Sequence, residues 1–104
     1  MIVHWYPDAT AEMLKIAAYI QDNFGVKCSK DFLWEVEHTE HLLCLSPEIG
    51  KKELLLEASP LTYRSVVVAR LNKIIYRIDG DIIYIVAFWP CRRDPKVLVA
   101  QIEG

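Results

Sequence analysis

The chain has 104 residues, 53% of them hydrophobic, and its formal net charge at pH 7 is −2. This length suits one domain, residues 1–104, with one core, and the apolar fraction excludes a disordered chain. The mild acidity excludes a protein that coats nucleic acid non-specifically, because such binding needs many cations to neutralise phosphates.

Export and membrane insertion are not indicated. No apolar run approaches the roughly 18 residues that span a bilayer, and the first residues lack the basic start and small-residue cleavage site of a signal peptide. We therefore expect a cytoplasmic protein without membrane contact. The three cysteines, Cys28, Cys44 and Cys91, are widely spaced and form no paired motif, which favours buried thiols over disulfides.

The first elements are a strand and a helix. Residues 2–6 predict a short strand that stops at Pro7, which cannot donate to a ladder. Asp8 is expected to cap the helix that follows, and Gly25 fits the left-handed position that ends it. Apolar residues at offsets of three and four predict one buried stripe on this helix: Met13, Ile16, Ala17, Ile20 and Phe24.

A second helix is expected to start near Ser29 and to end in residues 46–50, where proline and glycine favour a turn. Its inward face should carry these residues: Phe32, Val36, Leu43, Cys28 and Thr39. The apolar residues in 51–58 do not recur with a helical or strand period, so the segment is consistent with either a short helix or an extended strand at the sheet edge. The same two alternatives apply to the tail, residues 95–103.

β-Branched and aromatic residues dominate residues 63–89 and predict three antiparallel strands. Residues 72–89 form a hairpin, because Gly80 between two aspartates tolerates the positive φ that a tight turn needs. The element order predicts an α+β fold with an N-terminal strand, a two-helix hairpin and a three-stranded antiparallel sheet. Both helices should cover one face of the sheet and leave the other partly open.

Basic residues gather in the last part of this acidic chain: Arg64, Arg70, Lys73, Arg77, Arg92 and Arg93. This asymmetry indicates an anionic partner or a site that handles phosphate. Alternation along the strand places Lys73 and Arg77 on one face, expected to point away from the helices because an unpaired buried charge is costly. We expect Arg64 and Arg92 to converge with them there.

Several residues have a plainer alternative interpretation. Arg77 is flanked by acidic residues and is equally consistent with a surface ion pair. His38 and His41 lie one turn apart on the second helix, a spacing that a metal half-site shares, but exposed histidines on a polar helix face are usually surface groups. Cys91 has no base nearby in the sequence to activate it. We expect no metal and no cofactor.

The order and spacing of several short motifs resemble the RelE/ParE superfamily of toxins from type II toxin–antitoxin modules, also described as plasmid stabilisation proteins. The resemblance covers nearly the whole chain. It rests on Pro7-Asp8-Ala9, on Ser46-Pro47 with Gly50, on Tyr63-Arg64-Ser65-Val66-Val67, on residues 73–78, on residues 82–86 and on Arg92-Arg93-Asp94-Pro95.

The resemblance implies a growth inhibitor that a cognate antitoxin neutralises, with one of two targets. RelE-like members cut messenger RNA on the ribosome with basic residues on the open sheet face and a C-terminal Tyr or His, whereas ParE-like members are described as poisoning DNA gyrase without that set. Arg64, Lys73 and Arg92 match basic positions of the RelE-like members and are the catalytic candidates. However, no histidine follows His41, and Leu98 stands where the tyrosine is expected.

This departure favours a gyrase-directed toxin slightly. A ribosome-dependent endoribonuclease and a non-toxic binding remnant of the same fold remain alternatives, so whether the protein is an enzyme stays open. The resemblance also implies that the antitoxin's C-terminal segment wraps around the toxin. Phe88 and Trp89 beside Arg92 and Arg93 are expected to form its binding surface, with one of the two rings as an exposed anchor and the other in the core.

Overall fold

The computed structural model describes residues 1–91, 93 and 95–103, with 95 and 103 described by backbone alone. A five-stranded sheet has the order β1-β5-β4-β3-β2. β1 (Ile2–Trp5) runs parallel to β5 (Ile82–Pro90), and the other neighbours are antiparallel. The remaining strands are β2 (Lys51–Lys52), β3 (Arg64–Val68) and β4 (Asn72–Asp79).

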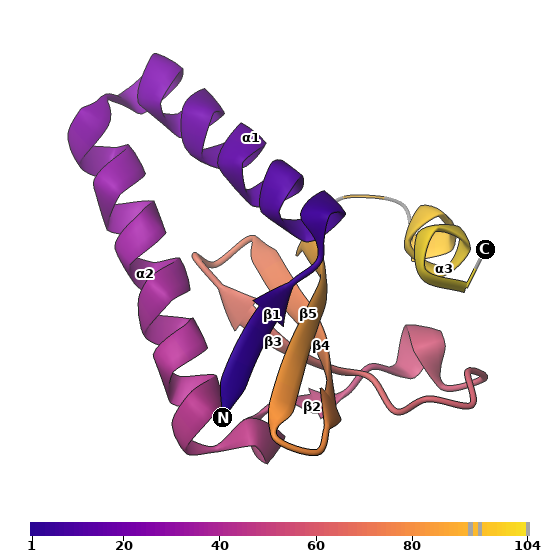
Figure 1. Ribbon diagram of the computed structural model, residues 1–104. Helices are drawn as coiled ribbons and strands as arrows, with labels where there is room; N and C mark the ends of the chain where they lie inside the picture. The colour runs from indigo at the N-terminus through magenta and orange to yellow at the C-terminus, as the bar shows by residue number, and fades with distance from the viewer. Residues whose placement is uncertain (92, 94, 104) are drawn as a thin grey trace.

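Helices lie on both sides of the sheet (Figure 1). α1 (Pro7–Phe24) and α2 (Val26–Leu45) form a hairpin against one face, and α3 (Pro95–Glu103) packs against β5 on the other. The α+β class, the first strand, the helix hairpin and the three consecutive antiparallel strands are confirmed. Along the segment 51–58 both open alternatives occur, as β2 and the 3-10 turn η2 (Leu54–Leu56), and the tail is helical.

The start of α1 differs from the prediction. Tyr6 occupies the N-cap position without a side-chain capping bond, so the predicted Asp8 cap is wrong, and Asp8 lies in the first turn instead. Pro7 begins the helix because its fixed φ and missing N–H suit the first helical position. Gly25, at φ +97°, separates the helices, and α2 begins directly after it, earlier than Ser29.

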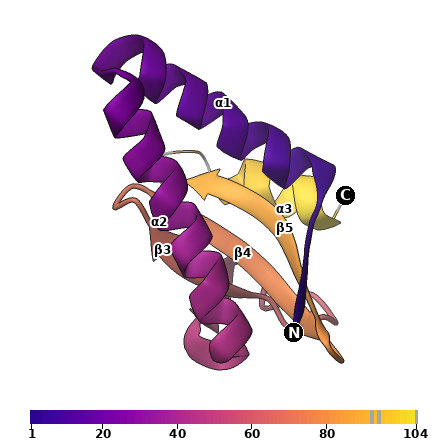
Figure 2. The same cartoon turned by 60° about the vertical axis from the view of Figure 1, so that its left-hand side comes forward.

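The helix hairpin buries its stripe only where the sheet lies beneath it. Ala17 is buried, and Met13, Ile16 and Ile20 pack against the core as predicted. Phe24 is 65% exposed, so its predicted burial is wrong. The hairpin projects beyond the end of the sheet (Figures 1 and 2). The Phe24 ring has an edge contact with Tyr19, with 6.5 Å between ring centres.

The inward face of α2 is only partly as predicted. Phe32, Val36 and Leu43 are buried, whereas Thr39 is half-buried. All three cysteines are free thiols, and Cys28 and Cys91 are exposed, so burial was predicted wrongly for these two. No helix within the described residues is long and apolar enough to cross a membrane.

The sheet separates two cores. The first lies under α1 and α2 and includes Ile74, Tyr76 and Phe88. The second face, expected to be partly open, carries a core of its own beneath η2 and α3: Leu56, Tyr63, Ile75, Val86, Ala87, Trp89 and Leu98. The second face is therefore less open than alternation alone indicated.

A β-bulge in β5 sets which side chain faces which core. Ile75 pairs with Ala87, but Tyr76 pairs with Ile85, so Val86 is an extra residue in the ladder. Val86 and Ala87 consequently both belong to the second core. The alternation then resumes with Phe88 on the helix side and Trp89 on the α3 side.

Candidate functional site

The sheet register divides the basic residues that were expected to converge. Arg64 lies directly opposite Tyr76, a residue of the first core, and opposite residues of an antiparallel pair share a face. Arg64 therefore lies on the helix side, where its Nη1 donates to the Gly50 carbonyl at 2.8 Å. Its predicted convergence with Lys73 and Arg77 is wrong. Arg92 lies outside the described residues.

Lys73 does lie on the second face, as predicted, but it is paired. Its Nζ is 2.7 Å from Glu53 Oε2, and the two side chains are only 19% and 7% exposed. Burial by itself raises the pKa of Glu53, but hydrogen bonds from Lys73 and Ser65 outweigh burial and leave that pKa below its usual value. A cation held this way cannot meet a phosphate without leaving a buried carboxylate unpaired.

Arg77 has a different environment on the same face. Its guanidinium lies 4.3 Å from the centre of the Tyr84 ring, and Nη2 donates to the Tyr6 hydroxyl at 3.4 Å. The hydrogen bond with Tyr6 raises the pKa of Arg77, so the side chain stays charged. Its carboxylate neighbour, Asp79, is 3.7 Å away with a side chain 69% exposed. Arg77 also lines a cavity of about 170 Å³ with Tyr63 and Tyr6.

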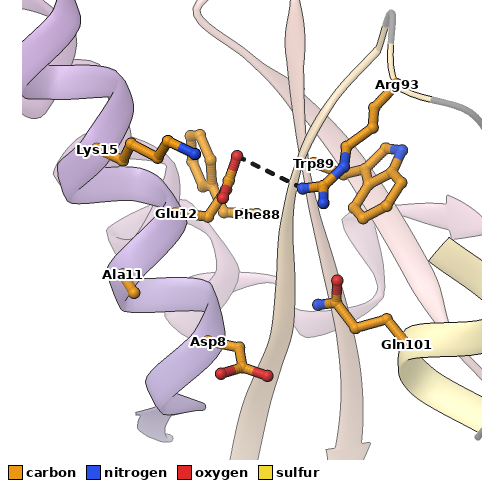
Figure 3. A pocket seen from close by; sticks show the side chains of 8 residues that line it. All are labelled: Asp8, Ala11, Glu12, Lys15, Phe88, Trp89, Arg93 and Gln101. Carbon is orange, nitrogen blue, oxygen red and sulfur yellow. Dashed lines mark ion pairs between the residues drawn. The ribbon is translucent and has the colours of Figure 1, made fainter. Parts of the chain in front are cut away.

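A polar pocket of about 230 Å³ lies between α1, the end of β5 and α3. Arg93 crosses it, with Nη1 3.6 Å from Glu12 Oε1 on α1 and the guanidinium 4.7 Å from the centre of the Trp89 ring. Figure 3 shows Arg93 reaching from the β5 side toward Glu12, with Gln101 of α3 below it. In this pocket the Arg93 guanidinium therefore forms a long, weak ion pair with the Glu12 carboxylate.

Three of the four residues predicted to bind an antitoxin line this pocket: Phe88, Trp89 and Arg93. One of the two rings was predicted to be an exposed anchor, and this is wrong, because Phe88 and Trp89 are 1% and 2% exposed, each in a different core. The bulge and the cover that α3 supplies account for this burial. Whether these residues contact a partner stays a prediction.

The α1 side of the pocket was not foreseen. Asp8, Glu12 and Lys15 supply its charged wall. Their spacing of four and then three residues puts them on one helix face, which is the sequence signal that could have found them.

Other highlighted residues lie elsewhere. His38 stacks on Trp34 at 5.0 Å between ring centres, and no group of three metal-ligating side chains occurs in the described part of the chain. Tyr19 is exposed, whereas Tyr63 is buried. Leu98 is fully buried in the second core, where a RelE-like member is expected to carry its tyrosine.

A helix hairpin on one face of a five-stranded sheet, with the last strands antiparallel, agrees with the fold expected of a RelE/ParE-type toxin. A family model described as "ParE toxin of type II toxin-antitoxin system, parDE" matches residues 3–95. The chain belongs to the ParE toxin family, and it is a ParE-type toxin of a ParDE toxin–antitoxin system.

One similar solved structure is described as "Chromosomal ParDE TA system from P. aeruginosa". The TM-score is 0.70 at 16% sequence identity, over 86% of this chain and 95% of that chain. At this identity the likeness shows the shared fold. No match was found among curated proteins.

Proposed function

We propose that this toxin inhibits growth by acting on DNA gyrase and not by cutting messenger RNA. The observation that carries the proposal is the Glu53–Lys73 pair, which neutralises one of the cations that ribonuclease chemistry would use. Arg64 lies on the opposite side of the sheet, so among the described candidates Arg64 and Lys73 do not share a face, which supports the proposal. Cleavage of RNA by the ribose 2′-hydroxyl needs a base, stabilising cations and a proton donor in one place.

The buried Leu98 supports the same proposal, because an alkyl side chain can neither donate nor accept the proton that cleavage requires. A ribosome-dependent endoribonuclease remains the second candidate. It is favoured by Arg77, whose guanidinium lies beside the Tyr6 hydroxyl and lines a cavity on the second face. Arg77 is therefore the residue of the predicted functional surface that we propose either target contacts.

The antitoxin that a ParDE system implies is proposed to neutralise the toxin at the pocket between α1 and α3. Arg93 is 42% exposed there and lies 3.6 Å from its Glu12 partner, a length that marks a weak pair. A carboxylate of the antitoxin could replace Glu12 and form a shorter contact. Trp89 supplies the aromatic surface beneath the guanidinium. Toxin, antitoxin and target are proposed to meet in the cytoplasm.

Induced expression of the toxin without its antitoxin tests the target. Growth, DNA breakage, plasmid supercoiling, translation and message integrity are followed in parallel. Broken DNA with intact messages at the onset of growth arrest is the expected result. Cleaved messages with intact DNA would select the ribonuclease, and normal growth at full expression would select a non-toxic remnant.

A further inference from the structure

The cavity beside Arg77 is lined by residues that come from distant parts of the chain. Its volume is about 170 Å³, close to the ~150 Å³ of an engineered protein cavity that binds benzene. Leu61, Val86 and Ile102 give it apolar walls, which come from the segment before β3, from β5 and from α3. The cavity therefore has room for one flat ring system between apolar surfaces.

Two side chains of opposite charge also line the cavity. Arg77 lines it from β4, and Asp8 lines it from the first turn of α1. Arg77 is only loosely paired, since Asp79 is 3.7 Å away and its side chain is 69% exposed. Asp8 is exposed and forms no ion pair with any residue that the structure describes. The cavity thus offers a ligand hydrogen-bond donors from the guanidinium and acceptors from the carboxylate.

Aromatic side chains hold the Arg77 guanidinium in place. Arg77 and His4 lie opposite Tyr84 from the two neighbouring strands. The guanidinium is 4.3 Å from the centre of the Tyr84 ring, and the His4 ring packs edge-on against that ring with 5.6 Å between centres. Tyr6 accepts a hydrogen bond from Arg77 Nη2 and makes an edge contact with Tyr84. A planar guanidinium held this way is preorganised for a ligand with two adjacent acceptors.

The opposite charges restrict the chemistry of the ligand. A carboxylate or a phosphate would be attracted by Arg77 but repelled by Asp8, and a cationic group would meet the reverse. A neutral group satisfies both only if one edge accepts hydrogen bonds and another donates them. Guanine is such a group, because its N7 and O6 are the pair of acceptors that arginine contacts most often, and its N1 and N2 carry donors. Adenine places an amino donor where guanine has O6, so it would leave Arg77 one acceptor short.

We propose that this cavity binds a guanine base. Arg77 donates to N7 and O6, Asp8 accepts from the N1 and N2 donors, and the apolar walls cover the faces of the ring. The cavity has room for the base alone, so the sugar and phosphate stay outside. The base belongs to a free nucleotide or to an unpaired position in a nucleic acid chain, since the donor edge of guanine is engaged in a duplex. This proposal goes beyond the antitoxin and the target proposed above, and it requires neither.

Calorimetry of the full chain, separated from its antitoxin, with GMP, AMP, CMP and UMP tests the proposal. We expect GMP to bind more tightly than each of the others by about tenfold or more. Asp8→Asn replaces the carboxylate with an amide of the same shape and should weaken GMP binding by about tenfold or more. Arg77→Lys keeps the charge but loses the paired donors, and should abolish the preference for GMP. Asp22→Asn makes the same change as Asp8→Asn at an exposed residue of α1 outside the cavity and should leave binding unchanged.

Circular dichroism and thermal melting of each variant establish that it is folded. No GMP binding at about 1 mM would overturn the proposal, as would equal binding of all the nucleotides, or full GMP affinity in folded Asp8→Asn and Arg77→Lys. A single-stranded oligonucleotide with one guanine in a thymine tract identifies the source of the base. Tighter binding than GMP assigns the site to a nucleic acid chain, weaker binding assigns it to a free nucleotide, and both results support guanine recognition. Gyrase-dependent DNA cleavage by a toxin that binds no guanine would overturn the site and leave the proposed target standing.

Discussion

Lys73 and Glu53 form an ion pair of 2.7 Å that is largely shielded from solvent and connects β4 to the segment between β2 and η2. Glu53 also accepts a hydrogen bond from the Leu55 N–H at 3.3 Å, which caps η2. The carboxylate is therefore part of the structure on which the second core rests. Lys73, a catalytic candidate from the sequence, takes a structural position.

Replacing Lys73 with alanine should lower the free energy of unfolding by roughly 1–3 kcal/mol, because it leaves Glu53 shielded and unpaired. Toxicity per folded molecule should be retained. Urea denaturation and a growth assay normalised to soluble protein check the two effects. Lys51→Ala is the control, because Lys51 is exposed and forms no ion pair with any residue that the structure describes, and it should stay within about 0.5 kcal/mol. Lost toxicity with unchanged stability in Lys73→Ala would show that Lys73 contacts the target.

The lowered pKa of Glu53 gives this pair a pH dependence. A carboxyl whose pKa is lower in the folded than in the unfolded state stabilises the fold above its unfolded value, and that contribution is lost as the pH falls through the folded value. The stability difference between the parent and Glu53→Gln should therefore be largest at neutral pH and shrink below about pH 4.5, the ordinary carboxyl value. Denaturant titrations of both proteins between pH 7 and pH 3 measure it, and a difference that grows on acidification would contradict the assignment.

Tyr76 should be a strong determinant of stability at the end of the first core. Its hydroxyl donates to the Pro47 carbonyl at 2.6 Å and accepts from the Gly50 N–H at 3.0 Å. Tyr76→Phe leaves both backbone groups without this partner, and we expect a loss of about 1–3 kcal/mol in thermal or chemical unfolding. Preserved stability would mean that water replaces the hydroxyl.

Gly50→Ala should destabilise the same region by steric conflict. A Cβ there would lie 2.6 Å from the Tyr76 hydroxyl and 2.8 Å from the Ser65 carbonyl. Gly80→Ala is the matched control, because its Cβ meets nothing within 4 Å and only its φ of +58° is unfavourable. Unfolding experiments should show the larger loss for Gly50→Ala, and the reverse order would refute the steric explanation.

Arg77→Ala should abolish toxicity while costing no more than about 1 kcal/mol, the usual worth of a partly exposed cation–π contact. Asp79→Asn is the control, since it removes only a long contact to an exposed carboxylate. That variant should remain toxic in the same growth assay. Full toxicity of Arg77→Ala would place the working surface elsewhere.

Arg93→Ala should weaken antitoxin binding by roughly tenfold, the effect of losing a charged contact worth about 1.4 kcal/mol. Glu12→Gln should bind at least as tightly as the parent, because it frees Arg93 for the antitoxin. Calorimetry with the purified antitoxin measures both constants. Equal weakening by the two variants would show that the Glu12–Arg93 pair itself shapes the pocket.

The strands and helices of this fold could be predicted because their causes are local. The alternation along residues 72–89, the Gly80 turn and the Gly25 break all lie within short windows of sequence. The bulge at Val86 could not be predicted, because register depends on contacts between strands. Alternation alone puts Phe88 and Trp89 on opposite faces, but the second core that buries Trp89 is built with Leu56 and Leu98, which are distant in sequence. The register of β3 is what separates Arg64 from Lys73.

The parts of the site that escaped prediction are contacts between distant residues. Glu53 lies twenty residues from Lys73 along the chain, and Glu12 lies on another element from Arg93. No local pattern of charge reveals which acid will meet which base. Lys73 and Arg77 were nevertheless assigned correctly to one face, because that inference needs only the alternation of a single strand.

The most direct test of the gyrase proposal uses purified toxin, gyrase, plasmid DNA and ATP, with supercoiling and cleaved DNA followed together. Accumulation of cleaved DNA that depends on both proteins and disappears in Arg77→Ala is the predicted result. Unchanged supercoiling and intact plasmid, with the same preparation cutting messenger RNA on translating ribosomes, would contradict it and establish the ribonuclease.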